Sequence, residues 1–293
     1  AIATHTDNIH LLLAVRIGEM WLPQLARQLA SIDQFANGRL TINIISSDIP
    51  GETLASAPRY QRTREWMRGL RSLLSGEQLE MHGDFVDLSV APPRAATVDR
   101  TCPPLYFGGL SEDAKDVAAA EADVFLTWPD TVASVAATVR EMQDRAAAYD
   151  RELVCGLRTH VIVRETEQEA RTAAERLISQ LDADTGEAIR NKSLDSASVG
   201  VQRQAALRDS ATDDGYAEDN LWTGIGRARS GAGAAIVGDP DQVLAKLKAY
   251  EDAGVGAFIL SGYPHREECD LFTNYVLPRM NHAPLKPRWT PSR

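Results

Sequence analysis

The chain has 293 residues, 44% of them hydrophobic and 25% charged, and its formal net charge is −10. This composition excludes collagen, coiled coils and intrinsic disorder. The acidic balance and the lack of a dense basic stripe argue against a nucleic-acid binder. No apolar run approaches the roughly 18 residues of a membrane span. The three cysteines have neither disulfide-framework nor metal-ligand spacing, which predicts a reducing, cytoplasmic location and no metal site.

Short β-branched runs alternate with longer helical patterns along the chain, which is typical of a parallel α/β fold. Six strands are predicted, at residues 11–17, 40–45, 104–107, 123–127, 153–163 and 256–260. Helices are predicted at residues 23–35, 58–74, 130–149, 166–181 and 240–253, with another beginning at Ser111 and a last one ending near residue 280. The boundaries rest on the stop signal Asn37-Gly38, on Ser111 as an N-cap, on Thr166 with Glu169 as a capping box, and on Asp239-Pro240 as a helix start.

Three segments interrupt this alternation. Residues 80–99 form an excursion with a predicted small hairpin around residues 82–84. Residues 183–232 are polar, contain glycine and are too long for an ordinary connection, so we interpret them as a lid-like insertion. We expect residues 1–280 to form one domain and residues 281–293, with their three prolines, to be a loosely held tail.

Consecutive βα units favour either a doubly wound sheet or a (β/α)8 barrel. No Gly-x-Gly-x-x-Gly follows the first strand, which argues against a dinucleotide-binding Rossmann domain. Six strands do not close an eight-stranded barrel, so a barrel would lack two strands. The chain begins at Ala1 without a Met or signal peptide, as though partway through a domain, so we expect the absent units to belong at the front.

Chemistry in such barrels lies at the carboxyl ends of the strands, and several polar residues follow predicted strands here. Arg158 and His160 lie two residues apart and therefore on one face of their strand. An arginine inside a strand needs an anion or a paired carboxylate if it is buried, whereas a lone histidine there is more often a hydrogen-bonded core residue. The turn at Gly108-Gly109 either binds a phosphate or is only a tight turn, and Trp128 alone is more often a packing residue. Tyr263 and His265 alone could mark only a strand-to-helix turn.

These segments together resemble the FMN-dependent alkanesulfonate monooxygenases of the bacterial-luciferase-like superfamily. The matching stretches are ASIDQFANGRLTIN (30–43), PLYFGG (104–109), DVFLTW (123–128), GLRTHVIVRET (156–166), DSASVGVQR (195–203), NLWTGIGRARSGAGAAIVGD (220–239) and FILSGYPH (258–265). The resemblance covers nearly the whole chain up to residue 280. The stretch around Arg158 and the last stretch are fairly specific to the sulfonate branch.

The resemblance implies a luciferase-like TIM barrel whose first two βα units are absent from this chain. It implies a two-component monooxygenase that uses FMNH2 and O2 to convert an alkanesulfonate to an aldehyde and sulfite. It also implies an NAD(P)H-dependent flavin reductase as partner, a soluble homodimer or homotetramer, and no nucleic-acid or membrane partner. By the resemblance, the catalytic residues are Arg158, His160, Arg229, Tyr263 and His265, and the flavin-binding residues are Asn43, Ser46, Tyr60, Gly109, Ser111 and Trp128.

The chain also departs from the family pattern. The first two βα units of the family have no counterpart in this chain, so a cysteine and a histidine of the family's active site have none either. Residues 44–48 replace a Val-Thr-Gly type of turn, Leu110 stands where a Ser is common, and Tyr60 lacks the usual preceding acidic residue. Three alternatives therefore stay open: a luciferase-like monooxygenase with a non-sulfonate substrate, a catalytically silent flavin-binding relative, and a deazaflavin-dependent oxidoreductase.

Overall fold

The main sheet contains nine strands among the described residues, and seven of them are parallel. The computed structural model describes residues 1–47, 49, 51–191 and 198–285. Six of the parallel strands follow one another in chain order, as β1 (Leu11–Arg16), β2 (Leu40–Ile45), β5 (Leu105–Gly108), β6 (Val124–Thr127), β7 (Val154–Val163) and β11 (Val255–Ser261). All six predicted strands are confirmed. A doubly wound sheet would reverse its strand order at a switch point, so the unbroken order identifies a TIM-barrel-type fold.

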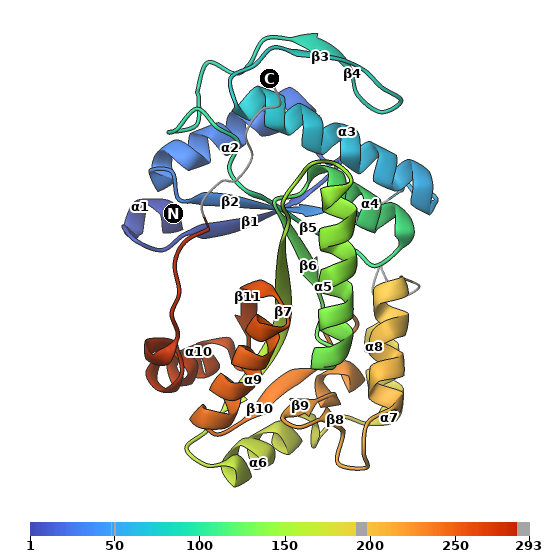
Figure 1. Ribbon diagram of the computed structural model, residues 1–293, viewed down its shortest axis with the longest axis vertical. Helices are drawn as coiled ribbons and strands as arrows, with labels where there is room; N and C mark the ends of the chain where they lie inside the picture. Colours follow the sequence, from blue (N-terminus) through green and yellow to red (C-terminus); the bar gives the residue numbers. More distant parts are fainter. Residues whose placement is uncertain (48, 50, 192–197, 286–293) are drawn as a thin grey trace.

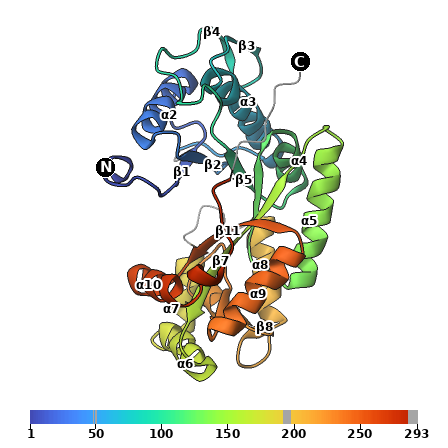
Figure 2. The ribbon, with the colours of Figure 1, turned by 60° about the vertical axis from the view of Figure 1, so that its left-hand side comes forward.

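Helices cover the outer face of this sheet. They are α2 (Leu22–Ala36), α3 (Ser56–Leu74), α4 (Glu112–Glu121), α5 (Val132–Ala147), α6 (Glu167–Ile178), α9 (Pro240–Asp252) and α10 (His265–Tyr275), with the short α1 (Ile2–His5) and the 3-10 turn η2 (Leu277–Arg279) near the two ends. Figures 1 and 2 show α2 and α3 beside β1 and β2, and α6, α9 and α10 around the lower part of β7. Within the described residues, β1 pairs only with β2, and β11 only with β7.

Alternation along the strands separates a packing face from a polar face. Ile42, Phe107, Phe125 and Leu157 are fully buried in the main hydrophobic core. The residues that alternate with them point to the opposite face of the sheet. That inner face carries polar side chains, among them Asn43, Tyr106, Arg158, His160 and Ser261.

The helix-boundary signals in the sequence are confirmed. Asn37 (φ 51°) and Gly38 (φ 76°) adopt the left-handed conformation that ends α2. The Ser111 hydroxyl accepts a hydrogen bond from the Ala114 N–H at the start of α4. Capping boxes open α6 and α9. The predicted hairpin is β3 (Leu79–His82) with β4 (Asp87–Val90).

The capping box of α6 provides a measurable contribution to stability. Thr166 Oγ1 accepts from the Glu169 N–H, and the Glu169 carboxylate accepts from the Thr166 N–H and hydroxyl. Thr166→Ala is therefore expected to lower the free energy of unfolding by about 1 kcal/mol, measured by urea denaturation. Thr172→Ala, which removes only a hydroxyl bonded to the Gln168 carbonyl within the same helix, is the control. Equal losses in the two variants would contradict the assigned role of the cap.

The predicted insertion contains regular structure. Its described part forms α7 (Ala183–Asn191), α8 (Val199–Asp209), β8 (Tyr216–Glu218), β9 (Leu221–Trp222) and the 3-10 turn η1 (Gly224–Arg227). The next strand, β10 (Ala235–Gly238), was not among the predicted strands; it pairs in parallel with the second half of β7. Asp48, Pro50, residues 192–197 and the tail from residue 286 onward lie outside the described residues, and with them most of the tail expected to be loosely held.

Among the described residues, none of the helices is long and apolar enough to cross a lipid bilayer.

Candidate active site

The middle of β7 presents a cation, Arg158, and a buried imidazole, His160, on the inner face of the sheet. Arg158 is half-buried, and among the described residues it has no carboxylate or hydrogen-bond partner. Burial and the nearby charge of Arg229 lower the pKa of Arg158. A buried arginine in a strand needs a carboxylate or another anion beside it, and none of the described carboxylates pairs with Arg158. Its positive charge is therefore available to a bound anion.

Three further predicted residues gather beside this pair. The Arg229 guanidinium donates a hydrogen bond of 2.8 Å from Nη1 to Tyr263 Oη. The Tyr263 ring lies 5.3 Å from the His160 ring and 4.9 Å from the His265 ring, centroid to centroid. His265 is exposed and is the first residue of α10. The structure thus brings all five predicted catalytic residues into one cluster, built from β7, the segment before β10, and the turn after β11.

His160 is an uncharged member of this cluster. Its ring is 1% exposed, its Nδ1 lies 3.0 Å from Ser261 Oγ, and its Nε2 is buried without a hydrogen bond to any described residue. Burial and the charges of Arg229 and Arg158 lower the pKa of His160 to about 4. Near pH 7 the imidazole is therefore neutral and can donate or accept one further hydrogen bond through Nε2.

The low pKa of His160 predicts a pH dependence of stability. Between the ordinary pKa of 6.5 and about 4, the unfolded chain binds a proton that the folded chain does not, so stability falls as the pH falls. From pH 7 to pH 5 this group is expected to cost about 2 kcal/mol of unfolding free energy. Urea denaturation of the wild type and of His160→Asn at both pH values measures it. The variant should lose less stability than the wild type over this interval, and identical losses would contradict the neutral histidine.

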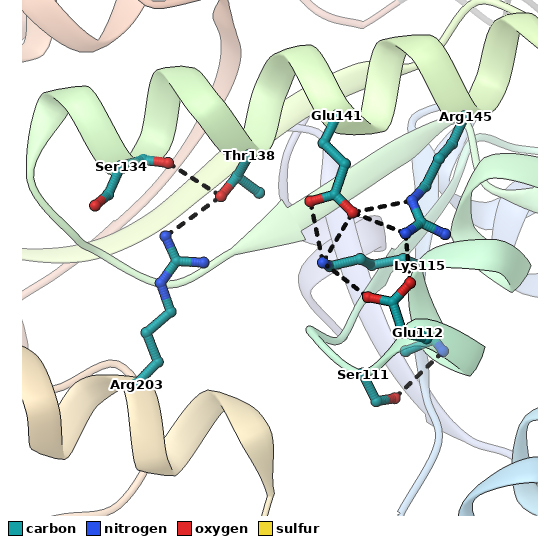
Figure 3. A network of polar contacts seen from close by, with 9 residues as sticks. Ser111, Glu112, Lys115, Ser134, Thr138, Glu141, Arg145 and Arg203 are labelled. Carbon is teal, nitrogen blue, oxygen red and sulfur yellow. Dashed lines mark hydrogen bonds and ion pairs between the residues drawn. The ribbon is translucent and has the colours of Figure 1, made fainter.

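The segment that carries Arg229 is held against the β6–α5 connection. Gln204 of α8 donates from its amide to the Pro129 carbonyl (2.7 Å) and accepts from the Gly233 N–H (2.8 Å). Arg203 pairs with Asp130 at 2.6 Å. It also donates a hydrogen bond to Thr138 of α5, as Figure 3 shows. These contacts fix the described part of the insertion beside the cluster.

Trp128 packs in this same region. A Cβ at Gly200 would lie 2.8 Å from Trp128 Cζ3, and one at Gly231 would lie 3.6 Å from Trp128 Cζ2. The packing interpretation of Trp128 is therefore supported. The same geometry places the indole against the segment that carries Arg229, because Arg229 Nη2 is also 3.6 Å from a Cβ at Gly231.

A second group of predicted residues gathers after β5. A Cβ at Gly109 would lie 2.6 Å from Ala114 Cβ and 3.4 Å from Tyr60 Oη, so close packing requires the glycine. Ser111 accepts from Ala114 at the start of α4 (Figure 3). The next residue, Glu112, is a carboxylate near pH 7. Hydrogen bonds from Arg145 and Lys115 hold the pKa of Glu112 below its ordinary value. The helix N-terminus thus has a carboxylate beside it, and the Ser111 hydroxyl still has a proton to donate to a ligand.

The last two predicted flavin contacts lie on β2 and just after it. Asn43 is half-buried and pairs in register with Ala14 on one side and Tyr106 on the other. Ser46 accepts a 2.7 Å hydrogen bond from Thr63 of α3, the helix that carries Tyr60. Strand pairing links this region to the cluster of predicted catalytic residues. Gly108 of β5 pairs with Leu126 of β6, and Leu126 pairs with Gly156 of β7, two residues before Arg158.

Two residues of the site were not among the sequence predictions. Ser261 ends β11 opposite His160, and its position two residues before Tyr263 was the only signal for it. Gln204 lies in a polar helix without any distinguishing spacing, so nothing in the sequence indicated that it bridges two loops.

Comparison with known proteins identifies the family. Residues 1–257 match the family described as luciferase-like monooxygenase. The chain belongs to this family. This family and the two relatives described next carry the name monooxygenase, which supports an enzyme over the alternative of a catalytically silent relative.

Relatives and solved structures agree with this assignment. The chain is 57% identical over 292 residues to a sulfoquinovose monooxygenase of Novosphingobium aromaticivorans, covering 97% of this chain and 81% of that protein. It is 48% identical over 283 residues to a sulfoquinovose monooxygenase of Agrobacterium fabrum, covering 96% and 73% respectively. Among solved structures it resembles riboflavin lyase (TM-score 0.74, 15% identity, covering 95% of this chain and 71% of that one) and DmoA from Hyphomicrobium sulfonivorans (TM-score 0.71, 18% identity, 95% and 69%). At these identities the structures support the fold alone.

The predicted superfamily is therefore confirmed, but its alkanesulfonate branch is not. The close relatives carry the name of a different sulfonate, sulfoquinovose. The alkanesulfonate branch, which the motifs around Arg158 and Tyr263 had suggested, therefore stays a prediction.

Proposed function

We propose that this luciferase-like monooxygenase uses reduced FMN and O2 to desulfonate an organosulfonate, and that sulfoquinovose, a hexose with a sulfonate on C6, is its substrate. The bond from this carbon to sulfur breaks, the carbon becomes an aldehyde, and sulfite leaves. One atom of O2 enters the aldehyde and the other leaves as water, with the two electrons supplied by FMNH2. An NAD(P)H-dependent flavin reductase supplies the FMNH2.

The observation that carries the proposal is the uncompensated charge of Arg158. It lies beside Arg229 and has no carboxylate among the described residues, so a bound sulfonate would supply the missing anion. A neutral imidazole at His160 adds a donor or acceptor without adding charge. The names of the two close relatives support a sugar sulfonate rather than a simple alkanesulfonate.

The residues of the second group fit a flavin in part. Bound FMN would supply the oxygen and electron chemistry that amino-acid side chains lack. Asn43 and Tyr60 would hold the flavin, and the Ser111 hydroxyl would donate to its phosphate. The carboxylate of Glu112 opposes a phosphate at the same helix end, so we expect the phosphate to add less affinity for FMN over riboflavin than an open helix N-terminus would.

Sulfite release tests the proposed function. Purified protein, a flavin reductase, FMN, NAD(P)H and air are incubated in parallel with sulfoquinovose and with octanesulfonate. Sulfite from sulfoquinovose at a much higher kcat/KM is the expected result. Preference for octanesulfonate would restore the alkanesulfonate assignment. No sulfite from either, together with tight binding of reduced FMN, would favour a monooxygenase with a non-sulfonate substrate.

A further inference from the structure

The hydrogen bond between Ser261 and His160 joins β11 to β7 at the site. Ser261 pairs in register with His160, so both side chains lie on the inner face of the sheet. Ser261 Oγ is 3.0 Å from His160 Nδ1, and among the described residues this is the only hydrogen bond of the serine hydroxyl. The histidine is fully buried, so its ring cannot exchange this partner for bulk water.

The direction of this bond decides which nitrogen of His160 carries the proton. A neutral imidazole has one N–H, and Nδ1 can either donate to Ser261 or accept from it. If Nδ1 donated, the Ser261 O–H would have no acceptor among the described residues. If the serine donates, its proton is satisfied and the imidazole proton is on Nε2.

The environment of Nε2 makes this proton useful. Nε2 is buried and bonds to no described residue. The charged or titratable groups that face the ring are Arg158 from β7, Arg229 from the segment before β10, and Tyr263 and His265 from the turn after β11. These groups contribute positive charge or hydroxyl donors and no carboxylate, so an anionic oxygen would be the natural acceptor for an Nε2–H.

We propose that Ser261 is a positioning residue: its hydroxyl holds His160 Nδ1, so that the neutral imidazole presents its Nε2 proton to an anionic oxygen between Arg158 and Arg229. The acceptor in this arrangement is an oxygen of the sulfonate, so the inference rests on the proposed function. Ser261 itself does not contact the reacting atoms. It acts by selecting the tautomer and the ring orientation of His160.

Two measurements on the same variants test the proposal. The first is a long-range ¹H–¹⁵N spectrum of histidine-labelled full-length protein at pH 7, with the His160 signals assigned by their loss in His160→Asn. The second is kcat/KM for sulfite release from sulfoquinovose. The variants are Ser261→Ala, Ser261→Thr, which keeps the hydroxyl, and Ser89→Ala, which removes an exposed hydroxyl that bonds Glu80 in the hairpin.

The wild type, Ser261→Thr and Ser89→Ala are expected to show His160 protonated at Nε2. Ser261→Ala should show a mixture of both tautomers, with kcat/KM lowered about tenfold and an unchanged urea midpoint. Ser261→Thr should recover most of the lost activity. A wild-type ring protonated at Nδ1, or a Ser261→Ala variant that loses activity without a change of tautomer, would overturn the proposal. So would wild-type kcat/KM in Ser261→Ala. Absence of sulfite from every form would contradict the proposed function instead, and the spectra would still decide the role of Ser261.

Discussion

Arg158→Met is expected to lower kcat/KM for sulfite release by about 10²–10³, the range seen when one donor to a developing anion is removed in a closed site. The protein should fold at least as well as the wild type. Arg158 has no carboxylate among the described residues, and its pKa is lowered by burial and by Arg229, so its charge opposes folding. Activity is measured by steady-state kinetics and stability by the urea midpoint.

Two controls separate charge from shape in this experiment. Arg158→Lys keeps the charge but not the planar fork of donors, so it should recover part of the activity. Arg164→Met removes the next arginine along the chain, directly after β7, which is paired with the buried Glu268 at 2.6 Å. That variant should lose about 3 kcal/mol of stability because it leaves a buried carboxylate without its partner. Near-wild-type activity in Arg158→Met would contradict the assignment of the anion site, and a large loss of stability would contradict its unpaired state.

The fold was largely predictable because local signals and global topology agree. The six strands alternate with helices whose ends are marked by Ser111, Thr166, Asp239 and the Asn37-Gly38 stop, and each signal acts within one turn of chain. β10 could not be predicted in the same way. It is a strand because β7 continues beyond β6 and offers it an edge.

The candidate site likewise has features that local sequence patterns predict and features that depend on the three-dimensional packing. Arg158 and His160 could be placed on one strand face from their spacing alone. The charge balance around Arg158 could not be predicted, because carboxylates near in sequence, such as Glu152 and Glu165, are set apart from it only by the three-dimensional packing. The bond from Ser261 to His160 depends on the register between β7 and β11, which no local pattern encodes.

Arg229→Ala is expected to lower kcat/KM for sulfite release by about 10–100-fold and to raise the share of O2 that ends as hydrogen peroxide. Arg229 contributes the second positive charge of the cluster and donates to Tyr263 Oη at 2.8 Å. Loss of one charge-assisted hydrogen bond to a closed site has this magnitude. Without this bond, Tyr263 loses a described partner, and the substrate anion loses part of the field that holds it during oxygen transfer. Sulfite formed per O2 consumed, measured with an oxygen electrode and a peroxide assay, reports the coupling.

The hydrogen bond can be separated from the charge by a double-mutant cycle. If Arg229 acts through Tyr263, the combined loss in Arg229→Ala with Tyr263→Phe should be smaller than the sum of the two single losses. Arg227→Ala, an exposed arginine in the neighbouring 3-10 turn, is the control and should keep wild-type coupling. Loss of the Arg229 charge should also raise the pKa of His160 above about 4, because that charge is one of the causes of the low value. Unchanged peroxide formation together with an unchanged His160 pKa would remove Arg229 from the site.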